Sequence, residues 1–517
     1  MAIPPIVWKL ILLVSVLAAV RFCYRGWRVR QLVRRTAAQH DIPLLPHSWI
    51  WGHLLVIGKL LDQLPRDTHG QYLPLLLAKE FPDLEKAGAM YIDIWPVMPP
   101  MLAVFHPDMM AEFTQTTSLP KHPHLSEEFM PFTHGNDLVA MSGQAWKTWR
   151  AILNPAFSSK NLLSLVPAFL EEIDVFVDDL KRAAQYGQTI RLEDRAVTCT
   201  IDIMGQAFVF VAKPLLVALN PLRPFRMWNN NRIIKNHLRP HIKRAIGEQR
   251  SNKRVEYKTI NSVATKSYLS MADSSKSSPN DIDQKFIDVV ISHYKVFFAA
   301  YDTTASTLSY AYHLLHQNPS ALTALRAEHD EIFGPDPSTV RSQIATAPPF
   351  LNQLPYTTAV LKETLRLFPP AGTIREGQPG FFLTHPDTKK QYPTEGMMVY
   401  GASFAVQRRE EYWLRANEFL PERWLVKEGD PLHPRKNAFR PFELGPRNCI
   451  GQELAQLELR AILALTVRAM DVESMYPEGS PTVLGEVAYQ VMEVGMATGH
   501  PKLGMPVRVR MREGIEG

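Results

Sequence analysis

The chain has little cysteine for its length: three residues in 517, at Cys23, Cys199 and Cys449. They lie far apart, with no Cys-x-x-Cys pair and no His/Cys spacing typical of zinc sites. This scarcity excludes a disulfide framework and a structural zinc site, and it is typical of proteins that face the reducing cytosol.

The chain also has little excess charge of either sign. Its formal net charge is +6, and much of that lies in one N-terminal cluster. A modest charge concentrated at one end does not indicate nucleic-acid binding, so we expect no nucleic-acid partner. The hydrophobic and charged fractions, 46% and 21%, are those of a globular protein that can bury a large core.

The N-terminus carries an apolar run, from about Ile6 to Tyr24, that reaches the roughly 20 residues needed to cross a bilayer. Basic residues follow it closely, which by the positive-inside bias leaves the rest of the chain in the cytosol. The alternatives are an interfacial helix and a cleaved signal peptide, but a signal peptide carries its charge before the apolar run. The basic residues are Arg21, Arg25, Arg28, Arg30, Arg34 and Arg35.

We divide the chain into an N-terminal membrane anchor (1–25), a basic, proline-containing linker (26–48) and one large domain (49–517). Helical periodicity dominates the large domain, which predicts a mainly α protein with small β-sheets (α+β). The expected elements are strands at 90–95 and 101–105, a helix from Pro107, helices at 169–184 and 283–316, a polar loop at 271–280 and a β-hairpin region at 481–511.

The stretch Phe-Glu-Leu-Gly-Pro-Arg-Asn-Cys-Ile-Gly (442–451) presents one cysteine at the beginning of a helix. Cys449 would lie among unpaired backbone N–H groups at the helix N-terminus, so we expect its thiolate to be stabilised. Gly445 and Gly451 permit a tight turn and the close approach of a flat group. A thiolate held in this way suits a soft or borderline metal such as heme iron. The alternative is a cysteine that serves only as a small buried hydrophobic residue.

Two pairs of residues share helix faces. Trp146 and Arg150 are four residues apart, and Glu363 and Arg366 are three apart. Ordinary packing for the first pair and a surface ion pair for the second are the alternatives to a functional role.

Asp302 and Thr303 lie in the middle of the 283–316 helical pattern, among apolar residues. Polar groups at such positions are costly unless a network or a function compensates. The alternative is that the hydroxyl only bonds to a preceding carbonyl.

Together these patterns resemble the cytochrome P450 superfamily. The 442–451 stretch resembles the heme-binding loop of this family, and Asp302-Thr303 resembles its acid–alcohol pair. Residues 363–366 resemble its Glu-x-x-Arg segment, and Pro421-Glu422-Arg423 resembles its Pro-Glu-Arg segment. The motifs occur in the family's order from about residue 43 to the end, and the anchor resembles that of microsomal members. One departure is Ala300, which stands where the family usually has glycine and narrows the expected oxygen groove.

The resemblance implies a cytochrome P450 fold that binds heme b, with Cys449 as the axial thiolate and the metal ligand. It implies that Asp302 and Thr303 are catalytic and supply protons to the oxygen-binding pocket. It also implies that Glu363, Arg366 and Arg423 form a buried network bracing the cysteine loop. The residues implied to hold the cofactor are Cys449, Trp146, Arg150, Arg375, Phe442 and Arg447, with the cationic ones binding the propionates.

The implied activity is that of a heme-thiolate monooxygenase, which inserts one atom of O2 into an apolar small molecule. Electrons would come from NADPH through NADPH-cytochrome P450 reductase, with cytochrome b5 as a second candidate donor. The implied location is the endoplasmic reticulum membrane, single-pass, with the catalytic domain facing the cytosol. The C-terminal sequence resembles filamentous-fungal members that make secondary metabolites such as polyketides, terpenoids or mycotoxins.

Two other functions stay open at this point: a heme-thiolate isomerase or dehydratase that uses no reductase, and a non-catalytic heme-binding protein at the membrane. The acid–alcohol pair favours the monooxygenase over the first. We expect the reductase to dock on basic residues near the cysteine loop, at Arg435, Lys436, Arg440 and Arg447. Substrate contacts are expected in the loop 122–139, at Phe298 and Tyr301, and at 371–374 and 498–500.

Overall fold

The computed structural model describes residues 5–133, 135–208, 223–251, 259–272, 279–296, 298–492 and 498–512. Helices make up most of it. The α-helices are α1 (Pro5–Gln39), α2 (Leu54–Leu61), α3 (Leu73–Glu80), α4 (Pro82–Ala87), α5 (Pro107–Ala111), α6 (Pro123–Thr133), α7 (Gly143–Leu153), α8 (Ser159–Leu163), α9 (Val166–Gln185), α10 (Leu192–Phe208), α11 (Arg223–Arg250), α12 (Ile260–Ala272), α13 (Pro279–Val296), α14 (Phe298–Gln317), α15 (Pro319–Phe333), α16 (Val340–Thr346), α17 (Pro355–Leu367), α18 (Ser403–Gln407) and α19 (Gln452–Thr466).

The described strands form small sheets. The four-stranded sheet has the order β1-β2-β7-β4, in which β2 and β7 are parallel and the other pairs antiparallel. The strands are β1 (Ala89–Ile92), β2 (Met101–Val104), β3 (Thr189–Arg191), β4 (Thr373–Glu376), β5 (Phe382–Thr384), β6 (Gln391–Pro393), β7 (Met398–Gly401), β8 (Met470–Ser474), β9 (Gln490–Met492), β10 (Gly499–Pro501) and β11 (Pro506–Met511).

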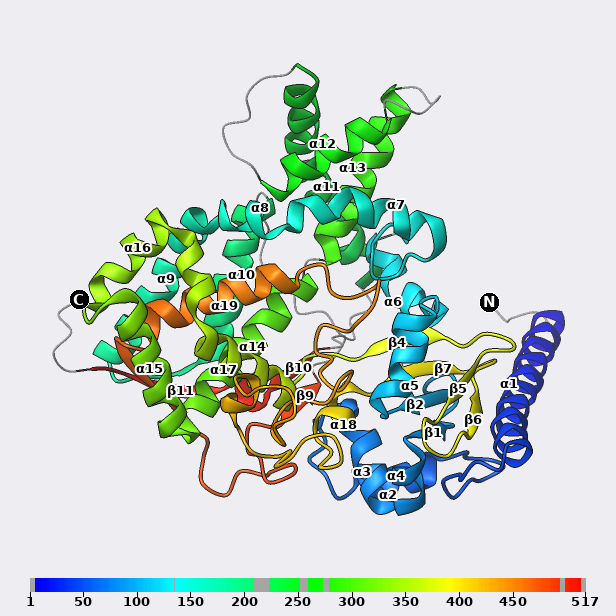
Figure 1. Cartoon of the computed structure of the whole chain (residues 1–517). Helices are drawn as coiled ribbons and strands as arrows, with labels where there is room; N and C mark the ends of the chain where they lie inside the picture. Colours follow the sequence, from blue (N-terminus) through cyan, green and yellow to red (C-terminus); the bar gives the residue numbers. More distant parts are fainter. Residues whose placement is uncertain are drawn as a thin grey trace.

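Many of the longer helices lie on one side of the molecule, and the main sheet lies on the other with α1 to α5 around it (Figure 1). Figure 1 shows α9, α14, α15, α17 and α19 on one side and the four-stranded sheet on the other, beside α1. Each side has its own hydrophobic core, exemplified by Phe169 and Ile462 among the helices and by Tyr91 and Val399 at the sheet. The mainly α architecture with small sheets is therefore confirmed.

Most of the expected elements are confirmed. The strands at 90–95 and 101–105 are β1 and β2, and the helix at 169–184 is α9. The central helical pattern corresponds to α13 and α14. The C-terminal hairpin region contains antiparallel β9 and β10. The polar loop begins and ends within α12 and α13, and residues 273–278 lie outside the described residues.

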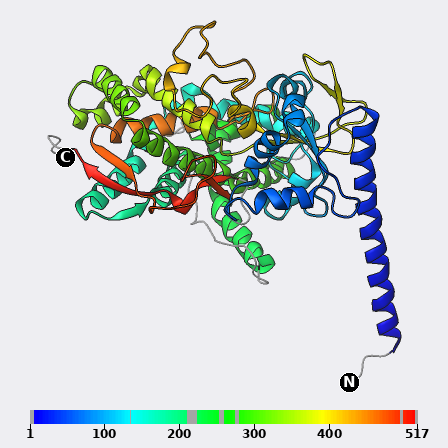
Figure 2. The same cartoon turned by 90° about the horizontal axis from the view of Figure 1, so that it is seen from below.

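The N-terminal helix is the part of the described chain that is long and apolar enough to cross a membrane, with a mean hydropathy of 2.2 over its most apolar window. It continues without a break to Gln39, through much of the segment we expected to be a linker. Figure 2 shows its first half projecting from the globular body and its second half lying against it.

Candidate active site

The loop that carries Cys449 is closed by its own backbone and rests on a neighbouring helical turn. The N–H of Cys449 donates to the carbonyl of Phe442 at 2.8 Å, and α19 begins three residues later. Gly445 has a φ of +88°, and a Cβ there would overlap the carbonyl oxygen of Thr114 in the short π-helix η2 (Glu112–Thr116). Only glycine meets both conditions, so this residue fixes the loop against η2.

The Cys449 sulfur faces the N–H groups of Gly451 and Gln452 and lies near Arg150, and all three lower the pKa of its thiol. Burial outweighs them, so the net pKa is raised. The stabilisation that we expected from the helix end is present in these N–H groups, and desolvation opposes it. The side chain is nevertheless accessible. A coordinated metal deprotonates a thiol outright, so this sulfur is suited to ionise on binding iron.

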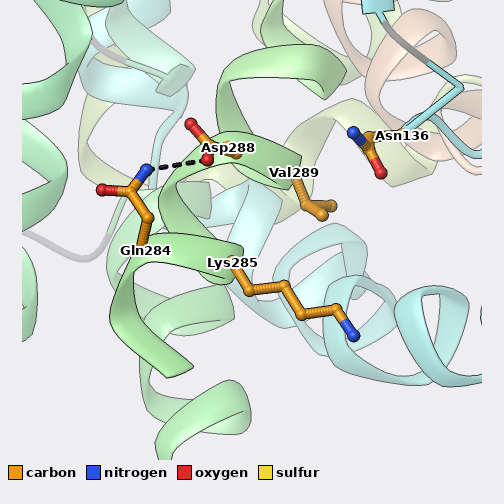
Figure 3. A pocket seen from close by; sticks show the side chains of 5 residues that line it. All are labelled: Asn136, Gln284, Lys285, Asp288 and Val289. Atoms are coloured by element: carbon orange, nitrogen blue, oxygen red, sulfur yellow. Dashed lines mark hydrogen bonds between the residues drawn. The ribbon is translucent and has the colours of Figure 1, made fainter. Parts of the chain in front are cut away.

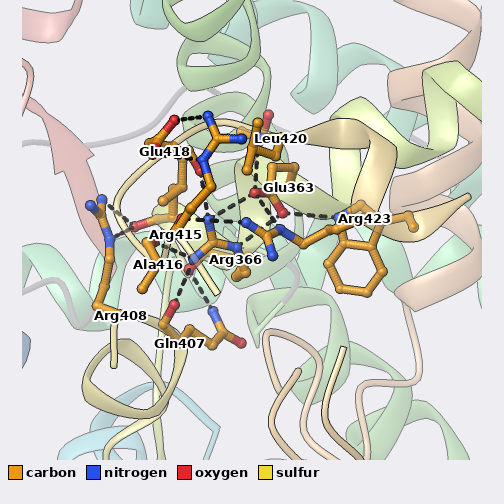
Figure 4. A network of polar contacts seen from close by, with 12 residues as sticks. Glu363, Arg366, Gln407, Arg408, Arg415, Ala416, Glu418, Leu420 and Arg423 are labelled. Atoms are coloured by element: carbon orange, nitrogen blue, oxygen red, sulfur yellow. Dashed lines mark hydrogen bonds and ion pairs between the residues drawn. The ribbon is translucent and has the colours of Figure 1, made fainter. Parts of the chain in front are cut away.

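Behind the cysteine loop lies a fully buried charge network (Figure 4). Arg366 of α17 donates to the Glu363 carboxylate at 2.7 and 3.0 Å, and Arg423 donates to the same group at 2.9 Å. All three side chains are 0% exposed. The Trp424 indole N–H also donates to Glu363 at 3.0 Å. The expected triad therefore exists, and the acid's oxygens are saturated with donors.

Gln407, a residue that sequence reasoning missed, joins this network to the cysteine loop. Its amide NH2 donates to the carbonyls of Leu365 and Arg366 at 3.0 and 2.9 Å. Its carbonyl oxygen accepts the backbone N–H of Arg440 at 2.8 Å. Arg440 in turn donates to the Thr114 hydroxyl at 2.6 Å. One amide thus connects α17, α18 and the segment leading into the loop, and no local sequence pattern indicates it.

A second cluster contains cations that form no ion pair among the described residues, although the nearby Glu443 carboxylate raises the pKa of Arg375 and of Lys121 in part. Arg375 of β4 is 0% exposed, and none of its guanidinium nitrogens has a hydrogen-bond partner among the described residues. Burial lowers its pKa to about 10. Arg447 has a pKa lowered to about 9 by burial and by Arg375, and burial with the same two arginines lowers the pKa of Lys121. Within the described residues none of the three forms an ion pair. This cation cluster (Lys121, Arg375 and Arg447) therefore fits an anionic ligand.

The cation cluster and the accessible cysteine together fit a heme. The buried Arg375 guanidinium, which has no acceptor among the described residues, and the Lys121 and Arg447 cations beside it suit the two propionate carboxylates, and the sulfur would supply the thiolate ligand. A Cβ added at Gly451 would approach only the Cys449 sulfur, at 3.8 Å, so the start of α19 leaves room beside the ligand. Lys121 was not among the expected residues, because a lone lysine in a loop carries no motif.

Trp146 and Arg150, from α7, reach the same region by different contacts. The Arg447 guanidinium lies 4.7 Å from the Trp146 ring centre, so the two stack. Arg150 donates to the carbonyl and side chain of Asn448 at 2.8 and 3.0 Å, and to Asn154 at 2.7 Å. Trp146 therefore supports a member of the cation cluster, and Arg150 holds the residue before Cys449.

On α14, the expected acid and alcohol have different surroundings. Asp302 is 2% exposed, and the imidazole of His500 lies 3.4 Å from its carboxylate. His500 also contacts Glu193 at 2.8 Å. The Thr303 hydroxyl donates to the Ala300 carbonyl over a long 3.3 Å, whereas Thr304 bonds to the same carbonyl at 2.9 Å. The Thr303 bond to the Ala300 carbonyl is therefore the weaker of the two.

Two expectations about the surface were wrong. The stretch 122–139 contains the helix α6 rather than only a loop. Arg440 is 1% exposed, and Arg447 donates to the carbonyls of Leu138 and Met141, so neither lies on a docking face. Lys436 remains exposed.

The side chain of Phe298 lies outside the described residues, and Tyr301 is half-buried against the helical core.

A pocket of about 350 Å³ opens between α13 and the loop that contains Asn136 (Figure 3). Gln284, Lys285 and Asp288 line it, and the Gln284 amide donates to Asp288 at 2.7 Å. Four of its five lining residues have polar or charged side chains, and none is aromatic, unlike the aromatic cavity expected for the substrate.

His106, His385 and Asp387 have a spacing that could hold a cation. However, the Nδ1 atoms of His106 and His385 accept backbone N–H groups, from Asp108 and Asp387, both at 3.2 Å. A neutral imidazole that accepts at Nδ1 carries its proton on Nε2, whereas a metal-ligating Nε2 must be deprotonated. We therefore infer no metal site in this group.

Comparisons with known proteins agree with this geometry. Residues 76–213 and 208–491 match the family model described as Cytochrome P450. The chain is 34% identical to cytochrome P450 monooxygenase polC of Polytolypa hystricis, over 97% of this chain and 96% of that protein. It is 30% identical to cytochrome P450 monooxygenase acrF of Aspergillus aculeatus, over 87% and 99%. The crystal structure of the cytochrome P450DA heme domain superposes with a TM-score of 0.67 at 20% identity, covering 91% and 96%, which shows a shared fold.

Proposed function

Because the chain belongs to the cytochrome P450 family, it is a heme-thiolate monooxygenase, and we propose that Cys449 supplies the thiolate. When bound, heme b activates dioxygen and inserts one oxygen atom into a small-molecule substrate, with electrons delivered from NADPH by a reductase. The protein's own part is to hold the cofactor, orient the substrate and manage protons. The relatives are named monooxygenases, which disfavours both a reductase-independent isomerase and a non-catalytic heme protein.

The observation that carries the cofactor assignment is the cation cluster. Lys121, Arg375 and Arg447 repel one another in a buried place and lack ion-pair partners within the described chain. Two propionate carboxylates would bring two negative charges to these three cations, so these residues would bind the carboxylates of the heme while Cys449 would supply the ligand to its iron. Trp146 would stack on the Arg447 guanidinium of the cluster. The Phe442 carbonyl would keep the shape of the loop by accepting the N–H of Cys449.

For proton transfer we propose Asp302 and Thr303. Asp302 would take up protons at its carboxylate, which His500 contacts, and Thr303 would pass or hold a proton at Oγ1. The place of Thr303 beside Asp302 on α14 supports this role, and its bond to the Ala300 carbonyl is long, at 3.3 Å. Its neighbour Thr304 is more firmly bonded and would serve the helix alone.

We further propose that α1 anchors the enzyme in the endoplasmic reticulum membrane with the catalytic domain in the cytosol. The apolar window of α1 is 0% buried by the protein, and its arginines follow the apolar run. Cytochrome b5 would be a second electron donor. By likeness to the fungal relatives, the substrate would be an apolar intermediate of secondary metabolism.

The test of thiolate ligation is the spectrum of the reduced, carbon-monoxide-bound protein. We expect the strongly red-shifted Soret band of thiolate ligation, and its loss in Cys449→Ala. Cys199→Ser is the matched control, because that cysteine is buried in the helical core, and its variant should keep the band. A histidine-type spectrum in the wild-type protein would contradict the assignment. With a reductase present, absence of NADPH consumption for every substrate would favour the isomerase alternative.

A further inference from the structure

The segment between Lys121 and Ser142 leaves the cation cluster and returns to it. The backbone N–H of Lys121 donates to the Ser142 hydroxyl at 3.2 Å, and the same hydroxyl oxygen accepts from Arg447 at 3.3 Å. The two ends of the segment therefore meet at one oxygen beside the cations. The stretch between them, 122–139, is where we expect contacts with the substrate.

The returning part of this segment is a tight turn. The Asp137 carboxylate is 0% exposed and accepts the N–H groups of Val139 and Ala140 at 2.9 and 2.8 Å. The Met141 N–H donates to the Asp137 carbonyl at 2.9 Å. An aspartate that binds the backbone two residues on fixes a turn of this kind. We call residues 137–142 the Asp137 turn.

The Asp137 turn binds Arg447 through oxygen atoms. Nη2 of the guanidinium donates to the carbonyls of Met141 and, at 3.3 Å, Leu138. Nη1 donates to the Ser142 hydroxyl. These three acceptors are neutral, so they orient the guanidinium without forming an ion pair with it. The place of Arg447 therefore depends on where this turn is held.

His293 of α13 holds the turn from the helical side. The Leu138 N–H donates to Nε2 of His293 at 3.1 Å, and Nδ1 bonds to the Val289 carbonyl at 2.8 Å. A backbone N–H only donates and a carbonyl only accepts, so the ring proton is on Nδ1 and Nε2 is the acceptor. Burial lowers the pKa of His293, which favours this neutral form. Among the described residues, the Asp137 carboxylate is the charged group that acts on the ring, and it raises this pKa in part.

A neutral anchor suits this place because the other partners of the turn are cations. Lys121 and Arg447 repel each other, as the lowered pKa of Lys121 shows. α13 is packed into the helical core through Phe286 and Ile291. His293 therefore connects the turn to a firmly held helix. Figure 3 shows this junction, where Asn136 lies beside α13.

We propose that His293 is a positioning residue for the heme, because its bond to Leu138 sets where the Asp137 turn presents Arg447 to the propionates. Leu138 is bonded at both of its backbone polar groups, with its N–H on α13 and its carbonyl on Arg447. The inference rests on the proposed binding of the heme carboxylates by the cation cluster, and it gives α13 a part in holding the cofactor. The alternative is a histidine that only completes the packing of α13.

The test compares two amides at position 293 in the purified holoprotein. The amide of His293→Asn reaches about as far as Nδ1, so it keeps the bond to Val289 and loses the bond to Leu138. The amide oxygen of His293→Gln reaches about as far as Nε2 and can accept the Leu138 N–H. We expect heme transfer to apomyoglobin to be about tenfold faster for the Asn variant, because a buried donor loses its acceptor. The Gln variant should stay close to the wild-type rate.

Ser292→Ala is the matched control. Ser292 is also buried on α13, and its hydroxyl bonds to the Asp288 carbonyl of the same helix at 2.8 Å. This variant should lose heme at the wild-type rate. Equal rates for the Asn and Gln variants, whether fast or slow, would overturn the inference, because the Leu138 bond would then have no effect of its own.

A double-mutant cycle tests the route through Arg447. Arg447→Met alone should speed heme loss, and His293→Asn should add little in that background, because both changes act on one contact. If the two effects multiply independently, His293 acts through packing and the inference is wrong. If Arg447→Met loses heme no faster than the wild type, the proposed role of the cation cluster is wrong, and the inference with it.

Hydrogen exchange gives a measurement that does not depend on the release of heme. In the holoprotein, the amides of residues 137–142 should exchange faster in His293→Asn than in His293→Gln, whereas those of α9 should be the same in both. Equal protection of the turn in the two variants would show that His293 does not hold it.

Discussion

Two charged clusters meet the segment that carries Cys449, one joined to it through Gln407 and Arg440 and the other including its Arg447, and they differ in how their charges are balanced. In the Glu363–Arg366–Arg423 network, every oxygen of the acid accepts a hydrogen bond, and backbone carbonyls take the remaining donors of Arg366. In the cation cluster, Arg375 has no hydrogen-bond partner among the described residues. The first is complete within the chain, whereas the second is incomplete without a ligand.

This difference separates a structural group from a binding group. Removing one member of a balanced network leaves the others uncompensated, so it should unfold the protein. Removing one member of an unbalanced cluster relieves repulsion in the apo-protein, so it should weaken only the binding of the ligand. The two clusters should therefore respond to mutation with opposite signs.

The largest effect is expected from Glu363→Ala, which leaves Arg366 and Arg423 buried without their acid. We expect a loss of about 3–5 kcal/mol in the free energy of unfolding, enough to prevent accumulation of folded protein. Urea unfolding or the yield of folded protein measures it. Glu418→Gln is the control, because its ion pair with Arg415 is exposed and should contribute little. A Glu363→Ala protein as stable as the wild type would contradict the structural role of the Glu363 network, and with it the difference drawn between the two clusters.

In the cation cluster, Arg375→Met should act in two directions. Heme binding should weaken by about ten- to a hundredfold, because charge-assisted hydrogen bonds contribute roughly 1.5–3 kcal/mol. The apo form of the variant should be more stable to unfolding than the wild-type apo-protein, because it no longer buries an unpaired cation. Heme transfer to apomyoglobin measures the first and thermal unfolding of the apo-protein the second. Loss of apo-protein stability would show that Arg375 has an internal partner.

A smaller effect is expected at the connection between the first network and the cysteine loop. Gln407→Leu leaves the Arg440 N–H and two α17 carbonyls without partners, at about 1–3 kcal/mol. The cysteine should then detach more readily, so the red-shifted Soret band should decay faster under mild denaturant. Gln407→Glu keeps the acceptor for Arg440 and should decay at an intermediate rate. Equal decay in all three proteins would mean that Gln407 does not hold the loop.

The smallest change in stability is expected for Thr303→Ala, which lies outside both clusters. Its hydrogen bond is long, so the free energy of unfolding should change by less than about 1 kcal/mol. The expected effect is uncoupling, with more hydrogen peroxide released per NADPH consumed. Thr304→Ala is the matched control and should stay coupled. Similar coupling in both variants would argue against the proton role of Thr303.

The sequence predicted the parts that are local. Periodicity located α9 and α14, β-branched and aromatic runs located β1 and β2, and the glycines around Cys449 indicated its loop. The Glu363 network was predicted through resemblance, since its partners are 60 residues apart in the chain. These features depend on patterns within a few residues, or on motifs that carry their own signature.

Other features depend on contacts that no single stretch encodes. Gln407 and Lys121 belong to no motif, and their roles follow only from what the fold brings near them. The N–H groups that face Cys449 were predicted from the helix end, whereas the desolvation that opposes them is not visible in the sequence. Arg440 and Arg447 were placed on the surface because arginine usually lies there, yet tertiary contacts turn both inward.

The unbroken course of α1 limits where this enzyme can be shortened. A chain that starts at Gly26 would keep Arg30 beside Asp93 and cover Trp95 in part. A chain that starts after Gln39 would leave the buried Asp93 carboxylate without its guanidinium, with only His47 and the Trp95 N–H as partners. An N-terminal deletion made to solubilise this protein should therefore stop before Arg30, because the Arg30–Asp93 ion pair lies only a few residues after the apolar run.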